Sequence, residues 1–90
     1  PEYLAKEAIK ISKQMSNIDV KILHKKDLED LKMGSFLSVA QGAAVEPKLI
    51  VFNYSGGPKD QKPVVLVGKG VTFDSGGISL KPGAGMDEMK

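Results

Sequence analysis

Residues 64–82 read VVLVGKGVTFDSGGISLKP, and the rest of the chain is interpreted outward from them. The apolar run Val64–Val67 predicts a buried strand because it offers no polar face to solvent. The glycines that follow predict sharp turns, since glycine adopts backbone angles that other residues avoid. The loop carries Lys69, Asp74 and Lys81, and α/β proteins commonly place functional residues on loops that follow buried strands.

The first part of the chain predicts a helix followed by a strand. Over residues 1–15 the apolar residues recur at the spacing of one helix face; they are Leu4, Ala8, Ile11 and Met15. Residues 18–22 alternate apolar and polar side chains, which predicts a half-buried strand. The helix is therefore expected to pack its apolar stripe on another element.

Two short helices and two strands are expected next. Asp27 is a candidate N-cap of the first helix, which Gly34 ends or bends, and the second helix runs to Gly42. Residues 49–52, LIVF, are apolar on both faces, which predicts an interior strand over residues 48–54. The polar turn after it can join this strand to an antiparallel neighbour at Val64–Val67. The expected fold class is α/β, with helices layered on a mixed sheet.

The composition excludes several classes of protein. The net charge of +2 comes from 13 lysines spread along the chain, with no arginine, against 11 acidic residues. Nucleic-acid binding is not expected, because such proteins cluster basic residues and use arginine for bidentate contacts. Cysteine is absent, so neither a disulfide nor a thiolate metal site can form. No apolar run is long enough to span a membrane, and the N-terminus does not resemble a signal peptide. A cytoplasmic location is the default, and Pro1 in place of an initiator methionine suggests a chain cut from something longer.

Residues 67–82, VGKGVTFDSGGISLKP, and residues 86–90, MDEMK, closely resemble the signature of the leucine aminopeptidase family, the cytosolic metallo-aminopeptidases. The likeness extends diffusely over the preceding residues and is specific only after residue 66. It implies that residues 1–90 are the start of the catalytic domain of a layered α/β metallo-exopeptidase, with the remainder absent. It also implies peptide substrates with a leucine-type N-terminal residue, a homo-hexamer and a two-metal centre.

The resemblance assigns roles to four residues. Lys69 and Asp74 match metal ligands: the lysine amine must be neutral to bind a metal, whereas the carboxylate is a hard donor suited to Zn²⁺, Mn²⁺ or Mg²⁺. Lys81 matches a catalytic lysine whose ammonium polarises the scissile carbonyl and stabilises the oxyanion. Met89 matches a methionine that lines the pocket for the substrate side chain, although its thioether would fit ordinary core equally well. Bicarbonate, held by an arginine outside this sequence, is the implied base.

Each assignment has a simpler alternative. Lys69 and Lys81 are also ordinary as solvated loop lysines, and Asp74 as the first residue of an Asx turn before Ser75–Gly76. His24, the sole histidine, has no second ligand at helical spacing and is expected at the surface, at a strand end. Because the resemblance implies further metal ligands outside these 90 residues, the chain alone is expected to be inactive. The alternative function is a non-catalytic α/β module that binds an anion or a protein partner through the glycine-rich loop.

Overall fold

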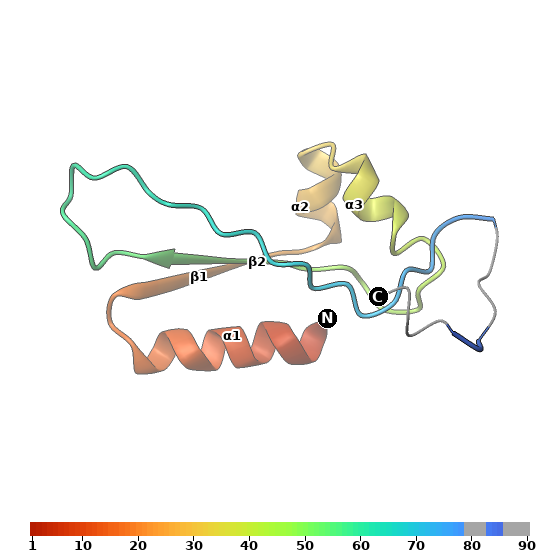
Figure 1. Ribbon diagram of the computed structural model, residues 1–90, viewed down its shortest axis with the longest axis horizontal. Helices are drawn as coiled ribbons and strands as arrows, with labels where there is room; N and C mark the ends of the chain where they lie inside the picture. Colours follow the sequence, from red (N-terminus) through yellow and green to blue (C-terminus); the bar gives the residue numbers. More distant parts are fainter. Residues whose placement is uncertain (79–82, 86–90) are drawn as a thin grey trace.

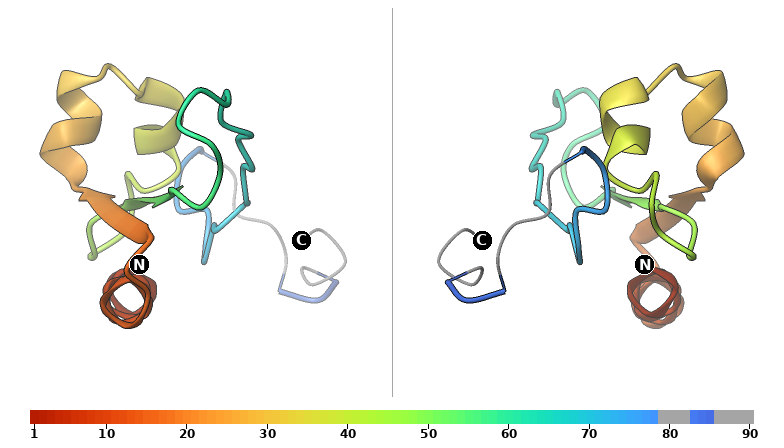
Figure 2. Two further views of the ribbon diagram at one scale, coloured as in Figure 1. Left: turned by 90° about the vertical axis from the view of Figure 1, so that its left-hand side faces the viewer. Right: turned by 90° about the vertical axis from the view of Figure 1, so that its right-hand side faces the viewer.

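The computed structural model describes residues 1–78 and 83–85, in which three helices accompany a two-stranded sheet. The order along the chain is α1 (Glu2–Gln14), β1 (Ile18–Leu23), α2 (Lys25–Asp30), α3 (Gly34–Ser38) and β2 (Leu49–Tyr54) (Figure 1). The helix α1 lies on one side of the sheet, and α2 and α3 lie on the other (Figures 1 and 2). The described part of the chain is therefore a small α/β unit, as the pattern of elements predicted. None of its helices has the length and apolar character needed to cross a membrane.

The sheet consists of β1 and β2, which pair antiparallel from Ile18 opposite Tyr54 to Leu23 opposite Leu49. Both strands lie where the apolar pattern predicted them. The predicted partner of β2 is wrong, however, because β2 pairs with β1 and not with Val64–Val67. Those four residues form no strand, and their exposed fractions range from 76% to 92%.

The run Val64–Val67 stays outside the sheet for a physical reason. A strand that is apolar on both faces is stable only where other elements cover both faces. Figure 1 shows the chain turning after β2 and returning past it, without a helix or strand laid over the returning segment. Pro63 at its start has no N–H to donate to a neighbouring strand. The prediction that β2 is an interior strand is therefore wrong for the described residues: Phe52 and Tyr54 are 47% and 68% exposed.

The helix α1 contacts β1 through small side chains. Ala5 and Ala8 are 3% and 2% exposed, because alanine lets a helix backbone approach its neighbour closely. The predicted apolar stripe is confirmed only at Ala8. Its larger members, Leu4, Ile11 and Met15, are between 42% and 48% exposed.

The short helices begin and end at other residues than predicted. Asp27 is not the N-cap of α2, which is His24; instead its Oδ2 accepts the backbone N–H of His24 at 2.8 Å from the third helical position. The chain leaves α2 at Lys32, whose φ of 56° is left-handed, and Gly34 begins α3. Leu28 on α2 is completely buried, where α2 contacts both β1 and α3.

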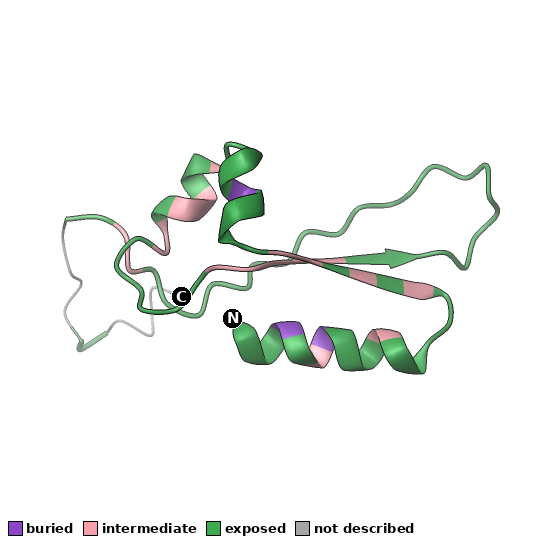
Figure 3. Cartoon of the chain, turned by 180° about the vertical axis from the view of Figure 1, so that it is seen from behind, coloured by how far each residue is buried: buried purple, intermediate pink, exposed green. Residues whose placement is uncertain are grey.

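The described residues bury little apolar surface. Their buried hydrophobic residues are Ala5, Ala8 and Leu28, and Figure 3 shows how sparse the buried positions are. The radius of gyration is 16.0 Å, whereas a compact domain of this length would measure about 12 Å. The chain is therefore extended and leaves much apolar surface uncovered.

Candidate functional site

Lys69 lies on the exposed, extended segment that follows Val64–Val67. The glycines beside it, Gly68 and Gly70, have open space where a Cβ would lie and show no left-handed backbone angle. The predicted sharp turns at these two glycines are therefore wrong; the loop turns at Gly77, whose φ is 91°. Within residues 1–78 and 83–85 Lys69 takes part in no ion pair. Its amine is thus presented to solvent at the entrance of the loop.

Asp74 is exposed, and its carboxylate is oriented by its own loop. Its Oδ1 accepts the backbone N–H of Gly76 at 3.0 Å, the geometry of an Asx turn. The simpler interpretation of Asp74 is therefore present in the structure. It does not compete with metal binding, because an ionised carboxylate has about four lone-pair sites and this bond uses one of them.

The loop is attached to the end of α3 by the residue after Asp74. The backbone N–H and the hydroxyl of Ser75 both donate to the carbonyl oxygen of Val39, at 2.9 and 3.0 Å. We call residues 38–42, on which the loop lies, the α3 seat. The sequence indicates no such contact, because Ser75 and Val39 are 36 residues apart.

Two glycines allow the loop and the α3 seat to approach each other. A Cβ on Gly42 would lie 2.6 Å from the carbonyl oxygen of Ser75. A Cβ on Gly76 would overlap the carbonyl oxygen of Ser38. Neither glycine has a left-handed φ, so close backbone approach, and not backbone freedom, is what requires glycine here.

Lys81 and Met89 lie outside the described residues. An amine and a carboxylate are both suitable donors for Zn²⁺ or Mn²⁺, which fits the implied metal centre in type. They do not fit it in number, since a single Zn²⁺ takes four ligands. Across the described ranges, moreover, no group of three or more His, Cys, Asp or Glu residues could hold a metal ion.

A second polar cluster joins Glu2 at the start of α1, His24 just after β1 and Lys48 just before β2. Lys48 Nζ lies 3.1 Å from Glu2 Oε2 and 3.1 Å from His24 Nδ1, and the Lys48 side chain is only 7% exposed. The hydrogen bond from Lys48 and its charge lower the pKa of Glu2 below the ordinary value of 4.5. The prediction that His24 is exposed at a strand end is confirmed. Its bond to Lys48 was missed, because a lysine before a strand looks like an ordinary surface residue.

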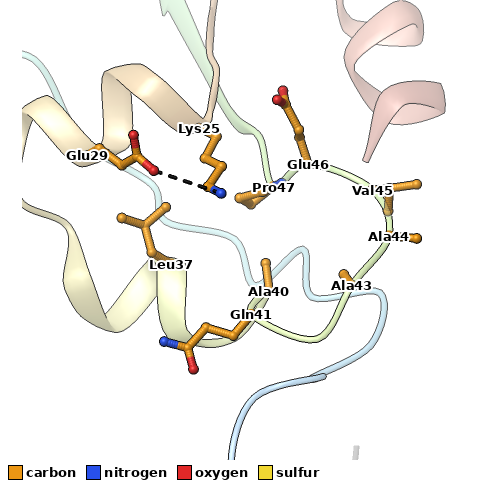
Figure 4. A pocket seen from close by; sticks show the side chains of 10 residues that line it. All are labelled: Lys25, Glu29, Leu37, Ala40, Gln41, Ala43, Ala44, Val45, Glu46 and Pro47. Atoms are coloured by element: carbon orange, nitrogen blue, oxygen red, sulfur yellow. Dashed lines mark ion pairs between the residues drawn. The ribbon is translucent and has the colours of Figure 1, made fainter.

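A hollow with a volume of about 460 Å³ is lined by neither Lys69 nor Asp74. Figure 4 shows its lining side chains, among them the Lys25–Glu29 ion pair, with 3.9 Å between Nζ and Oε1. Its lining residues come from α2, α3 and the loop before β2: Lys25, Glu29, Leu37, Ala40, Gln41, Ala43, Ala44, Val45, Glu46 and Pro47. It therefore does not enclose the residues predicted to carry the chemistry.

Comparison with known proteins identifies the family. A sequence model described as "Cytosol aminopeptidase family, catalytic domain" matches residues 1–90. The chain is 61% identical to the probable cytosol aminopeptidase of Pseudomonas syringae pv. tomato, 59% to that of Azotobacter vinelandii and 57% to the cytosol aminopeptidase of Pseudomonas aeruginosa. Each match covers 100% of this chain and 18% of the relative's length. The chain thus belongs to the cytosol aminopeptidase family, and it represents a portion of that family's catalytic domain.

Proposed function

We propose that the protein from which these residues come is a metal-dependent aminopeptidase that removes N-terminal residues, leucine among the preferred, from peptides. The observation that carries the proposal is the orientation and the exposure of the Asp74 carboxylate. This carboxylate is oriented by Gly76 and exposed to solvent, on the same loop as Lys69, which forms no ion pair within residues 1–78 and 83–85. The family match over residues 1–90 supports the same function.

The residues named above would have different roles in the reaction. Asp74 and Lys69 would hold two divalent ions, Zn²⁺ or Mn²⁺ with Mg²⁺ as a further candidate, together with ligands from outside residues 1–90. Such ions supply Lewis-acid polarisation and a hydrolytic water of lowered pKa. Lys69 must lose its proton to act as a ligand, whereas Lys81 must keep its own to stabilise the developing oxyanion. Met89 would line the pocket for the substrate side chain, and bicarbonate would serve as the base.

We further propose that residues 1–90 are the beginning of a layered, mixed-sheet catalytic domain. The run Val64–Val67 supports this, because four neighbouring apolar residues that are at least 76% exposed have the pattern of an interior strand without its layers. The relatives are long enough to supply the missing layers, since this chain spans only 18% of their length. A homo-hexamer and a cytoplasmic location complete the proposal; the relatives' name, cytosol aminopeptidase, supports the location.

The test compares two lengths of chain in the hydrolysis of leucine anilide, with Mn²⁺ and bicarbonate supplied. We expect no turnover by the 90 residues alone. Turnover should appear when the chain is extended to the length of the relatives, and Lys81→Ala should abolish it. Activity of the short chain would contradict the need for outside ligands.

If neither length is active, the aminopeptidase proposal fails and the anion- or partner-binding module replaces it. A thermal shift in phosphate without any response to Mn²⁺ would then identify anion binding. The same measurement on Lys69→Ala would show whether the loop is responsible.

A further inference from the structure

We propose that Ser75 is a positioning residue, which holds the Asp74 carboxylate in place for metal binding by fastening the loop to the α3 seat. The inference rests on the proposed function, because it concerns a ligand of the proposed metal centre. It assigns a role to residues that orient Asp74 and do not bind the metal themselves.

The first observation is that two bonds from one residue converge on one acceptor. The Val39 carbonyl belongs to the C-terminal end of α3, where helix carbonyls have no partner within the helix. Ser75 supplies two donors to it, at 2.9 Å from the backbone and 3.0 Å from the hydroxyl. The hydroxyl bond is partly buried, which makes it costlier to lose than an exposed one. The loop is therefore fixed at Ser75 by a short helix that is itself packed on α2.

The second observation is independent of hydrogen bonding. Gly42 and Gly76 lie on opposite sides of the same contact, and a side chain on either one would meet the backbone of the other segment. Glycine is required at both positions only because a side chain would not fit there, since neither residue has a left-handed φ. Two such glycines at one contact define how closely the loop can lie on the α3 seat.

The third observation connects this contact to Asp74. Gly76, which lies against Ser38, is also the residue whose N–H donates to Asp74 Oδ1 at 3.0 Å. Asp74 is therefore held from both sides, by its peptide bond to Ser75 and by its side-chain bond to Gly76. If the loop moved off the α3 seat, the carboxylate would move with it. A ligand held in this way loses less conformational freedom when a metal binds.

The test is the affinity of the extended, full-length protein for Mn²⁺, measured by calorimetry on the metal-free protein, together with metal-free thermal unfolding. Ser75→Ala removes the hydroxyl bond and keeps the backbone bond, and Ser75→Thr keeps both. Loss of a residue that orients a ligand typically costs about 10–100-fold in metal affinity. We expect about a tenfold loss for Ser75→Ala and recovery of most of it by Ser75→Thr.

A second pair of variants tests the close approach. Gly76→Ala should weaken Mn²⁺ binding by about a hundredfold, at the upper end of the same range. Gly34→Ala is the matched control: it adds a methyl group to α3, where no described atom beyond the adjoining residues and the helix's own backbone lies within 4 Å of the new Cβ, and should leave the affinity unchanged.

The outcomes separate this inference from the proposed function. Weaker Mn²⁺ binding by Ser75→Ala, measured at a temperature at which the metal-free variant is fully folded, supports positioning, because a merely structural role would lower the Tm without changing the affinity of the folded protein. Mn²⁺ binding by Ser75→Ala equal to that of the unaltered protein overturns the inference and leaves the aminopeptidase proposal intact, as does an equal loss in Ser75→Thr. Failure of the unaltered protein to bind Mn²⁺ at all overturns both.

Discussion

Replacing Leu66 by alanine should cost far less stability in the short chain than in the extended protein. In the structure Leu66 is 91% exposed, so the 90-residue chain covers about a tenth of its side chain. Full burial of a leucine is worth about 1.5–3 kcal/mol, which leaves about 0.1–0.3 kcal/mol to lose here. In the extended protein the same residue would lie inside a layered sheet. There the loss of its methyl groups and the cavity left behind should cost about 2–5 kcal/mol.

The measurement is the urea midpoint of unfolding, followed by circular dichroism, for Leu66→Ala and the unaltered sequence in both lengths. Hydrogen exchange over residues 64–67 gives a second readout, since these amides should be unprotected in the short chain and protected in the long one. Equal costs of the substitution in the two lengths would refute the reasoning. So would rapid exchange of these amides in the extended protein, because an interior strand must pair its backbone.

Three further predictions use the described residues. Leu28→Ala should lower the free energy of unfolding by about 2–5 kcal/mol, whereas Leu31→Ala, at a residue 59% exposed, should cost at most about 1.2 kcal/mol; equal costs of the two substitutions in urea unfolding would contradict the position of the core. Since the folded pKa of Glu2 lies below 4.5, its bond to Lys48 stabilises the fold above that pH and is lost as pH falls through the folded pKa; Tm measured against pH should show an acid-side decline that Lys48→Met diminishes. Asp74→Asn keeps an oxygen for the Gly76 N–H but removes the charge, so calorimetry on the extended protein should show Mn²⁺ affinity falling by more than the roughly 10–100-fold expected of a positioning residue, and an unchanged affinity would exclude Asp74 as a ligand.

The helix and the two paired strands were predictable because their signals are local. Apolar side chains at Leu4, Ala8 and Ile11 recur at helical spacing, and the alternation over residues 18–22 recurs at strand spacing. The family was predictable for a different reason. Sixteen consecutive residues, 67–82, carry a signature that no short pattern could match in specificity.

The errors occurred where the state of a residue depends on what surrounds it. The apolar run Val64–Val67 predicted a buried strand, but a strand forms only when a partner accepts its hydrogen bonds and other layers cover its faces. Gly34 looked like a helix breaker, yet Lys32 adopts the left-handed angle and Gly34 starts α3. Asp27 looked like an N-cap, but it lies inside the first turn of α2. From there its carboxylate accepts the backbone N–H of His24, which is the N-cap.

By itself, the sequence determined the family, the positions of α1, β1 and β2, and the residues proposed to carry the chemistry. These properties depend on the identity and spacing of residues close together along the chain. Only the tertiary structure decided that Ser75 binds Val39 and that Lys48 lies between Glu2 and His24. Such contacts join residues far apart in sequence, and their formation depends on the packing of whole helices and strands, which no local pattern encodes.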